Sequence, residues 1–160
     1  MIIKSFELNK ISLEKYNFFL FYGENNGYKE EIIQKIVQKI KIEKITYFEN
    51  EILSSSEVFF NSLTSKSFFE TEKLIVVNKV TDKFKKKIDE ILEKNIKDIT
   101  IILNADELNK KSKLRSFFEK EKSLVCTPFY QDNYQTLARL ASDFFQKKQV
   151  SVSREIINLI

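Results

Sequence analysis

Five short runs of β-forming residues recur along this chain, and the segments between them repeat apolar residues with the period of a helix. The runs are residues 18–22, 45–48, 73–78, 99–104 and 124–127. Two of them contain LIVV and ITIIL, stretches as apolar as strands buried on both faces must be. This alternation predicts an α/β fold in which a five-stranded parallel sheet is flanked by helices.

The helical segments carry apolar residues three and four positions apart, which predicts one helix between each pair of strands. The markers are Ile32, Ile33, Ile36, Val37 and Ile40, then Val58, Phe59 and Leu63, then Phe84, Ile88, Ile91 and Leu92, then Leu114, Phe117 and Phe118. Ser54 stands three residues before Glu57, the spacing of a capping box. We therefore expect the second helix to begin at Ser54.

A different helical pattern follows the only proline, Pro128, which closes the fifth run. We place a domain boundary near Gln131, so that residues 1–131 form the first domain and residues 132–160 begin a helical second one. The apolar positions of this tail are Leu137, Leu140, Phe144, Ile156, Ile157 and Ile160. About thirty residues cannot bury them alone. We therefore expect the chain to be a fragment of a longer protein.

Composition excludes most catalytic and metal chemistry. The absence of histidine excludes catalytic triads that use an imidazole base, as well as zinc sites with imidazole ligands. The single cysteine, Cys126, can form no internal disulfide, and its apolar surroundings predict a buried, unreactive strand residue. No apolar stretch reaches the roughly 20 residues of a membrane span, and the N-terminus lacks a secretory signal. We expect a cytosolic protein.

The net charge of +4 suits a partner with phosphate groups, but it is weak evidence for one. Lysine is abundant here together with isoleucine, asparagine and phenylalanine, a composition typical of A+T-rich coding. The densest basic cluster comprises Lys83, Lys85, Lys86 and Lys87. We interpret it as the outer face of a helix in preference to a phosphate clamp.

The stretch YGENNGYKE after the first predicted strand has some of the parts of a nucleotide-binding P-loop. Lys29 stands six residues after Gly23, where a P-loop keeps its phosphate-reaching lysine. However, Tyr28 replaces the second glycine, and Glu30 replaces the hydroxyl that holds magnesium. Gly27 comes one position too early, so a cradle of backbone amides would be deformed.

The second half of a nucleotide site is also missing. A P-loop enzyme needs acidic residues at the end of a later strand, to hold magnesium and activate water. The strand containing LIVVNKV has Asn78 and Lys79 at that place. We therefore predict that the chain neither binds nor hydrolyses ATP and uses no metal or cofactor.

Three segments together carry a family resemblance: FLFYGENNGYKEE, SKSFFETEKLIVVNKV and ITIILNADELNKKSKLRSFFEKEKSLVCTPFY. They resemble the N-terminal part of the delta subunit of bacterial DNA polymerase III, a clamp-loader subunit. The family's YGE element corresponds to residues 22–24, its SLF-like element to 67–69, and its AD.LDKRSKL element to 105–114. Glu107 and Asn109 are small departures from that pattern.

The resemblance implies an AAA+-like fold with a RecA-like first domain, a small helical lid and a C-terminal collar. Such a subunit binds and opens the sliding clamp, the polymerase III beta subunit, for loading onto primed DNA during replication. It is a non-catalytic member of a DNA polymerase (nucleotidyltransferase) complex. Only the start of the lid falls within these residues and the collar is absent, so the chain could not bind other loader subunits through the collar. Any contact with primed DNA would be weak and independent of the DNA sequence.

The resemblance also implies where the clamp would bind. Phe68 and Phe69 are adjacent and flanked by polar residues, and the family inserts such a pair into a hydrophobic pocket of the clamp. Ser67 belongs to the same element, and Leu63, one or two turns earlier, would be a supporting contact. The alternative is that one phenylalanine fills the domain core, which is the commoner fate of a phenylalanine.

Two other functions remain open from the residues alone. Lys29 leaves open the alternative of a nucleotide-dependent enzyme whose loop departs from the usual P-loop pattern. A basic, sequence-nonspecific nucleic-acid-binding module would use lysines to neutralise phosphates and aromatic residues such as Tyr16 and Tyr28 for stacking.

Overall fold

The computed structural model describes residues 1–10, 15–40, 42, 44–65 and 72–157. The chain divides into two compact units, Met1–Phe129 (unit 1) and Tyr130–Ile160 (unit 2). The predicted clamp-contact residues Ser67, Phe68 and Phe69 lie outside the described residues. Within the described part of the chain, no helix is long and apolar enough to cross a bilayer.

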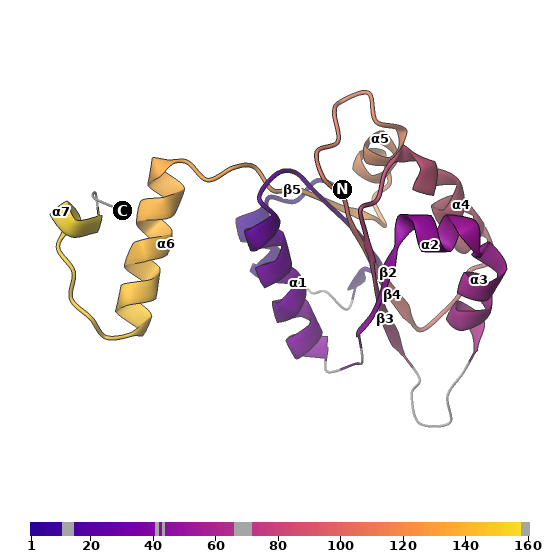
Figure 1. Ribbon diagram of the computed structural model, residues 1–160, viewed down its shortest axis with the longest axis horizontal. Coiled ribbons are helices and arrows are strands. Elements are labelled where there is room, and N and C mark those ends of the chain that lie inside the picture. Colours follow the sequence, from indigo (N-terminus) through magenta and orange to yellow (C-terminus); the bar gives the residue numbers. More distant parts are fainter. Residues whose placement is uncertain (11–14, 41, 43, 66–71, 158–160) are drawn as a thin grey trace. The chain divides into compact units, whose positions relative to one another are not determined.

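Unit 1 is built on a parallel five-stranded sheet, as predicted (Figure 1). Its strands are β1 (Phe18–Tyr22), β2 (Lys44–Phe48), β3 (Lys73–Asn78), β4 (Ile99–Asn104) and β5 (Val125–Pro128), in the order β2-β3-β4-β1-β5. Strands β1, β3 and β4 have the predicted bounds. Strand β2 begins one residue earlier than predicted, and β5 is shifted by one residue toward the C-terminus.

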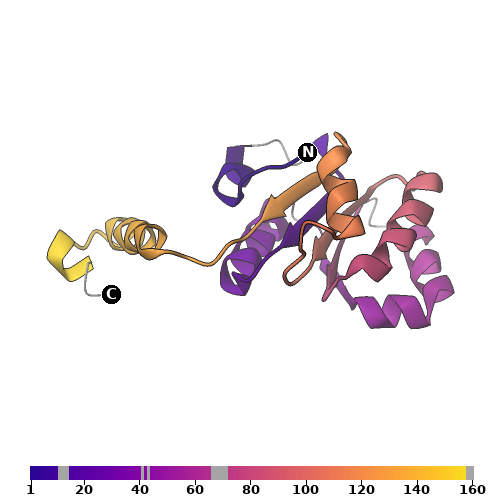
Figure 2. The ribbon, with the colours of Figure 1, turned by 90° about the horizontal axis from the view of Figure 1, so that it is seen from above.

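Helices cover both faces of this sheet, as Figures 1 and 2 show. Helix α1 (Asn26–Ile40) and the N-terminal turn η1 (Ser5–Lys10) lie on one face. The other face carries α2 (Glu49–Ser54), α3 (Ser56–Thr64), η3 (Asp82–Phe84), α4 (Lys85–Glu93) and α5 (Lys113–Lys120).

Successive strand residues point to opposite faces and so supply two separate cores. In β1, Leu20 and Tyr22 join the core under α2 to α5, while Phe19 and Phe21 join the core under α1. All four are at most 3% exposed. The central strands are therefore apolar at nearly every position because both of their faces are covered.

The predicted capping box at Ser54 is wrong. The chain is already helical from Glu49. At the start of this helix the Glu51 carboxylate accepts a hydrogen bond from the Phe48 backbone N–H at 2.7 Å. Ser54 ends this first short helix, and its hydroxyl donates to the Asn50 carbonyl at 2.7 Å. A side chain that bonds back into the preceding turn cannot cap the next helix, and α3 begins at Ser56.

Cys126 has the position predicted for it. It is fully buried in β5, and burial raises the pKa of its thiol to about 12. A thiol with so high a pKa stays protonated and therefore unreactive at neutral pH.

Unit 2 consists of helix α6 (Tyr134–Lys147) and the short helix α7 (Arg154–Ile157). Asn133 and Thr136 cap α6 reciprocally: the Asn133 side chain accepts from the Thr136 N–H at 3.0 Å, and the Thr136 hydroxyl accepts from the Asn133 N–H at 2.8 Å. No residue of α6, as the structure describes it, is buried. The helix is thus well capped but lacks a core.

Candidate functional site

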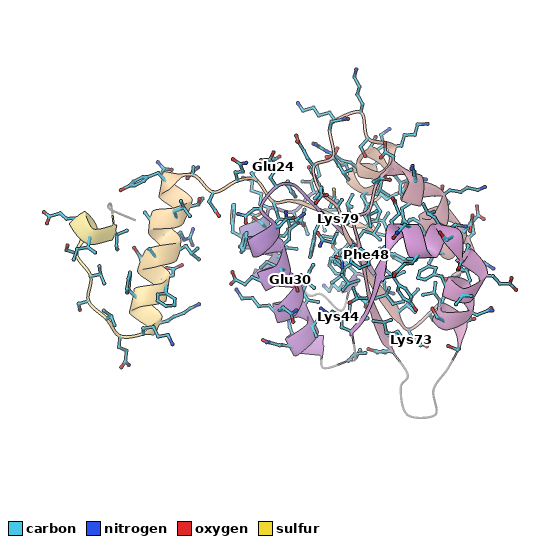
Figure 3. The ribbon with its side chains drawn as sticks, in the orientation of Figure 1. Glu24, Glu30, Lys44, Phe48, Lys73 and Lys79 are labelled. Atoms are coloured by element: carbon cyan, nitrogen blue, oxygen red, sulfur yellow. The ribbon has the colours of Figure 1, made fainter. Side chains whose placement is uncertain are left out.

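The P-loop-like stretch connects β1 to α1 at the edge of the sheet where the strands end. Strand β4 pairs with both β1 and β3, so the residues after these three strands meet at this edge. Figure 3 shows Glu24 and Lys79 there, with Lys44 and Lys73 toward the opposite edge. In open parallel sheets this carboxyl edge is the usual place for a ligand.

Gly23 brings the loop against the chain's own backbone. Its φ of 122° lies in a region open to glycine and strained for other residues, and its N–H donates to the Asp106 carbonyl at 3.1 Å. A Cβ atom at this position would lie 2.2 Å from the Phe129 carbonyl oxygen. The glycine therefore permits contact between two backbone segments, which differs from the approach to phosphate that a P-loop glycine serves.

The next amides of the loop are also bonded internally. The Asn25 N–H donates to the Phe129 carbonyl at 3.3 Å, and the Asn26 N–H donates to the Glu24 carbonyl at 2.8 Å. The Asn25 side chain caps helix α1 by accepting from the Tyr28 N–H at 3.1 Å. A phosphate at a helix N-terminus depends on free backbone donors, and here the N–H groups of Asn25, Asn26 and Tyr28 already have acceptors.

Tyr28 and Gly27 belong to the first turn of α1, not to a cradle. The Tyr28 ring packs edge-on against the buried Phe129 ring, with 5.5 Å between the centroids. Gly27 is exposed and helical, and a Cβ added to it would meet nothing within 4 Å. The residue that replaces the second P-loop glycine thus helps to hold the loop to the end of β5.

Lys29 points into the protein. Its side chain is 1% exposed, and its Nζ donates to the Ala105 carbonyl at 2.5 Å. Burial lowers the pKa of Lys29; the Asp106 carboxylate opposes this shift, and the positive charge of Lys79 adds to it. The lysine that would reach a phosphate instead joins α1 to the residue that follows β4.

The end of β3 has no acidic pair, as predicted from Asn78 and Lys79. The Asn78 Oδ1 accepts from the Asn104 Nδ2 at 2.9 Å, and the Lys79 Nζ pairs with the Asp106 carboxylate at 3.0 Å. Asp106 is an acid at this edge that sequence reasoning did not single out, although it follows a buried strand closely. Among the described residues, no three Asp, Glu, Cys or His side chains group as metal ligands.

Two buried side-chain oxygens at this edge have no hydrogen-bond partner within the described part of the chain. They are the Asn104 Oδ1 at the end of β4 and the Thr127 Oγ1 in β5, and both residues are in register with Phe21. An amide oxygen is an acceptor, whereas phosphate oxygens need donors. The Asn104 oxygen therefore offers a phosphate no donor, and the Thr127 hydroxyl is 0% exposed.

The basic cluster at helix α4 is largely engaged within the chain. Lys85 pairs with Asp89 at 2.5 Å and lies 3.8 Å from the centroid of the Phe117 ring, and Lys87 pairs with Glu90 at 2.9 Å. Lys83 and Lys86 are exposed. The two aromatic residues considered for stacking, Tyr16 and Tyr28, are partly buried against the core under α1. These contacts favour the interpretation of the lysine cluster as the outer face of a helix over a surface that binds nucleic acid.

Leu63 lies in α3 and is 4% exposed in the core under α2 to α5. It holds α3 against the sheet and offers no surface to a partner in this conformation. Leu63 was predicted as a supporting contact for the clamp, but in this structure its side chain is part of the core.

No known family model matches the sequence, and no curated protein matches it. Solved structures match the fold. The Bacillus subtilis DNA clamp loader delta protein (YqeN) matches with a TM-score of 0.67 at 14% identity, over 96% of this chain and 50% of that one. Domain III of the Thermotoga maritima replication initiation protein DnaA matches with a TM-score of 0.52 at 12% identity, over 97% of this chain and 71% of that one.

These likenesses establish the fold. The chain has an α/β fold in which helices flank a five-stranded parallel sheet, as the sequence had predicted. It spans about half the length of the clamp-loader delta protein it matches.

Proposed function

We propose that this chain is the clamp-binding part of a clamp-loader subunit, which binds and opens a sliding clamp for loading onto primed DNA and uses no nucleotide of its own. One observation carries the proposal. In a fold shared with a clamp-loader delta protein, the loop that would cradle nucleotide is closed by the chain's own atoms.

The closed loop argues against the nucleotide-dependent enzyme. A bound phosphate would have to displace the acceptors of the Asn25 and Tyr28 N–H groups and turn Lys29 away from Ala105. Each neutral hydrogen bond contributes about 1 kcal/mol, and one to a charged group about 1.5–3 kcal/mol. Breaking these hydrogen bonds opposes phosphate binding, and the Asp106 carboxylate at this edge is already paired with Lys79.

The clamp contact is assigned to Phe68 and Phe69, with Ser67 in the same element. Two adjacent aromatic residues ringed by polar ones have the composition of an interface hot spot. Leu63, a buried residue of α3, packs the helix that precedes this element onto the sheet. The other loader subunits would bind through a collar that is not part of these residues. Contact with primed DNA would be weak and independent of sequence, through exposed lysines such as Lys83 and Lys86.

The test is binding to an immobilised bacterial sliding clamp, the DNA polymerase III beta subunit, by surface plasmon resonance. Truncating one hot-spot aromatic residue costs about 2–4 kcal/mol, or roughly 30- to 1,000-fold in affinity. Phe68→Ala with Phe69→Ala should therefore abolish binding, while the thermal midpoint stays within a few degrees of the wild-type value.

Val58→Ala is the control, because Val58 is an apolar residue of α3 that is 68% exposed and outside the proposed contact. It should bind like the wild type. A double variant that is stable and still binds would place the clamp contact elsewhere. A double variant that unfolds would make the two phenylalanines core residues.

A further inference from the structure

Strand β2 is the open end of the sheet. Among the described residues it pairs with β3 alone, whereas β5, at the other end, is covered by the N-terminal residues. There the Ile3 N–H donates to the Cys126 carbonyl and the Cys126 N–H donates to the Met1 carbonyl, at 2.9 Å each. An end strand without such a cover presents a row of unpaired backbone groups, with which another chain can pair.

The direction of the β2 backbone groups follows from the hydrogen bonds of its neighbour. The Lys73 N–H donates to the Asp98 carbonyl at 2.9 Å, toward β4, so the groups of the next residue, Leu74, point toward β2. In a parallel pair, a residue opposite one that faces it has its own groups turned away. Lys44 lies opposite Leu74. Lys44 and, two residues later, Thr46 therefore direct their N–H and C=O groups outward.

The third residue of this outward row, Phe48, is already used within the chain. Its N–H donates to the Glu51 carboxylate at 2.7 Å, at the start of α2. This bond agrees with the outward direction and removes Phe48 from the open edge. Lys44 and Thr46 are left, each with one backbone donor and one acceptor. Figure 3 labels Lys44 and Phe48, the first and last residues of β2.

The open groups of β2 complement a second copy of the same strand. Residues directly opposite each other in an antiparallel pair exchange both N–H···O=C bonds at alternate positions. Two copies related by a two-fold axis at Ile45 would place Lys44 of each copy opposite Thr46 of the other. Every open N–H group of the two strands would then have an acceptor. A two-fold axis uses the same surface on both copies, as this pairing does.

The side chains of β2 fit the same arrangement. Ile45 would lie opposite its own copy, an apolar β-branched pair of the kind that stabilises sheets. Thr46 is exposed. The strand carries one charged residue, Lys44, and no proline, so it lacks most of the devices that keep an edge from pairing.

Helix α3 adds an exposed apolar residue beside this edge. Val58 and Ser62 are four residues apart and share one flank of the helix, and the Ser62 hydroxyl accepts from the Tyr47 hydroxyl of β2 at 3.1 Å. Phe60, about 200° around the helix from Val58, faces α4, where the Lys94 ammonium lies 5.1 Å from its ring centroid. Val58 is 68% exposed. It therefore borders the open edge of β2.

We propose that this chain forms a symmetric homodimer in which the β2 strands of two copies pair antiparallel about Ile45. The sheets of the two copies then continue into one. A strand of five residues buries little surface, so the dimer is weak. This inference does not depend on the proposed function.

Sedimentation velocity over a concentration series of the intact chain measures the dimer. We expect a dissociation constant on the order of 100 µM. Thr46→Pro removes the outward N–H and no bond to β3, so it should weaken the dimer at least about tenfold while the thermal midpoint stays within a few degrees. Thr46→Val is the matched control, because it keeps the backbone groups and the branched side chain. It should dimerise like the wild type.

Two charge variants test the register. Thr46→Glu puts a carboxylate opposite Lys44 of the other copy and should tighten the dimer about two- to tenfold at low salt. Thr46→Lys puts like charges at the same place and should weaken the dimer by a similar factor. Both effects should shrink at high salt, because salt screens exposed charges.

A wild-type chain that stays monomeric at about 1 mM would overturn the inference. Self-association that Thr46→Pro leaves unchanged would also overturn it and place the contact elsewhere, for example on the exposed apolar face of α6. If Thr46→Pro lowers the thermal midpoint strongly, the two charge variants decide. Opposite effects of Thr46→Glu and Thr46→Lys support the pairing about Ile45, and effects of the same sign overturn it.

Discussion

Helices α1 and α6 are nearly equal in length, with 15 and 14 residues, yet among the described residues only α1 is buried against a core. In α1, Ile32, Ile33 and Ile36 are at most 3% exposed against the sheet of unit 1. In α6 of unit 2, the apolar positions Leu137, Leu140 and Phe144 are between 44% and 57% exposed. Both helices have an amphipathic sequence, and both begin with an asparagine cap.

The difference shows that local signals and burial are separate requirements. Capping and period decide where a helix forms, whereas most of its stability in a protein comes from packing its apolar face. In unit 1 the helices have both local signals and an apolar face packed on the sheet. The amides of the β1–α1 loop also find acceptors within this unit. Unit 2 satisfies only the first, so its apolar face is available for packing on another surface.

The largest predicted difference between the units is in amide hydrogen exchange. Amides of β3 and β4 should exchange only through global unfolding, whereas an isolated helix of this length is marginal in water. We expect sheet amides to be at least about 1,000-fold better protected than those of α6, since global stabilities run from about 5 to 15 kcal/mol. Mass-spectrometric exchange on the intact chain measures this ratio. Equal protection would show that α6 is covered in solution, and the comparison of α1 with α6 would then fail.

Gly23→Ala should strongly destabilise unit 1, because the new Cβ would lie 2.2 Å from the Phe129 carbonyl oxygen at a φ of 122°. We expect a loss of about 3 kcal/mol or more in the free energy of unfolding, measured by urea denaturation. Gly27→Ala is the matched control, since that glycine is helical with open space around it. It should stabilise by about 0.5 kcal/mol. Equal effects at the two glycines would mean that the loop is not packed against Phe129.

Asp82 provides a smaller, pH-dependent test of unit 1. Its carboxylate accepts from the Ser112 hydroxyl at 2.5 Å and from the Lys113 and Leu114 N–H groups at 3.1 Å each, at the start of α5. Partial burial alone would raise the pKa of Asp82, but these hydrogen bonds outweigh it and lower the pKa below the ordinary value of 3.8. The stabilisation is therefore present above about pH 4 and is lost as the pH falls through the lowered pKa.

Asp82→Asn should cost about 1 kcal/mol at pH 7, a value discounted for the solvent exposure of this side chain. The difference from the wild type should be smaller at pH 2 than at pH 7. Asp89→Asn, which removes an i,i+4 pair with Lys85 on a helix surface, should cost no more than about 0.5 kcal/mol at either pH. Urea denaturation at the two pH values measures both variants, and a pH-independent cost at Asp82 would contradict the charge assignment.

The sheet was predictable because its signal is local. Runs such as LIVV and ITIIL admit few structures other than buried strands, and the bounds of β3 and β4 followed from them. The start of the second helix was not predictable in this way. Ser54 and Glu57 have the spacing of a capping box, but Glu51 bonds back to Phe48 and begins a helix before them. The Ser54–Glu57 spacing and the Glu51 contact with Phe48 are both signals for a helix start, and spacing alone does not show at which of them the helix begins.

The sequence shows that Tyr28, Glu30, Asn78 and Lys79 depart from the residues of a P-loop site, and the lack of nucleotide use stays a prediction. How the loop is closed could not be predicted. The contact between Lys29 and Ala105 joins residues 76 positions apart, so no sequence window contains it. The pairing of Lys79 with Asp106 likewise joins residues 27 positions apart and depends on the parallel order of the strands.

Clamp binding without nucleotide can be tested by titrating the wild-type chain against the clamp, by surface plasmon resonance, with and without saturating magnesium ATP. A nucleotide changes an affinity only if it binds the two states of the protein differently, and a closed loop binds it in neither. We predict binding with the same dissociation constant, within about twofold, under both conditions. An affinity that rises about tenfold with ATP, and loses that rise in Lys29→Ala, would contradict this prediction, because the loop would then be a working nucleotide site.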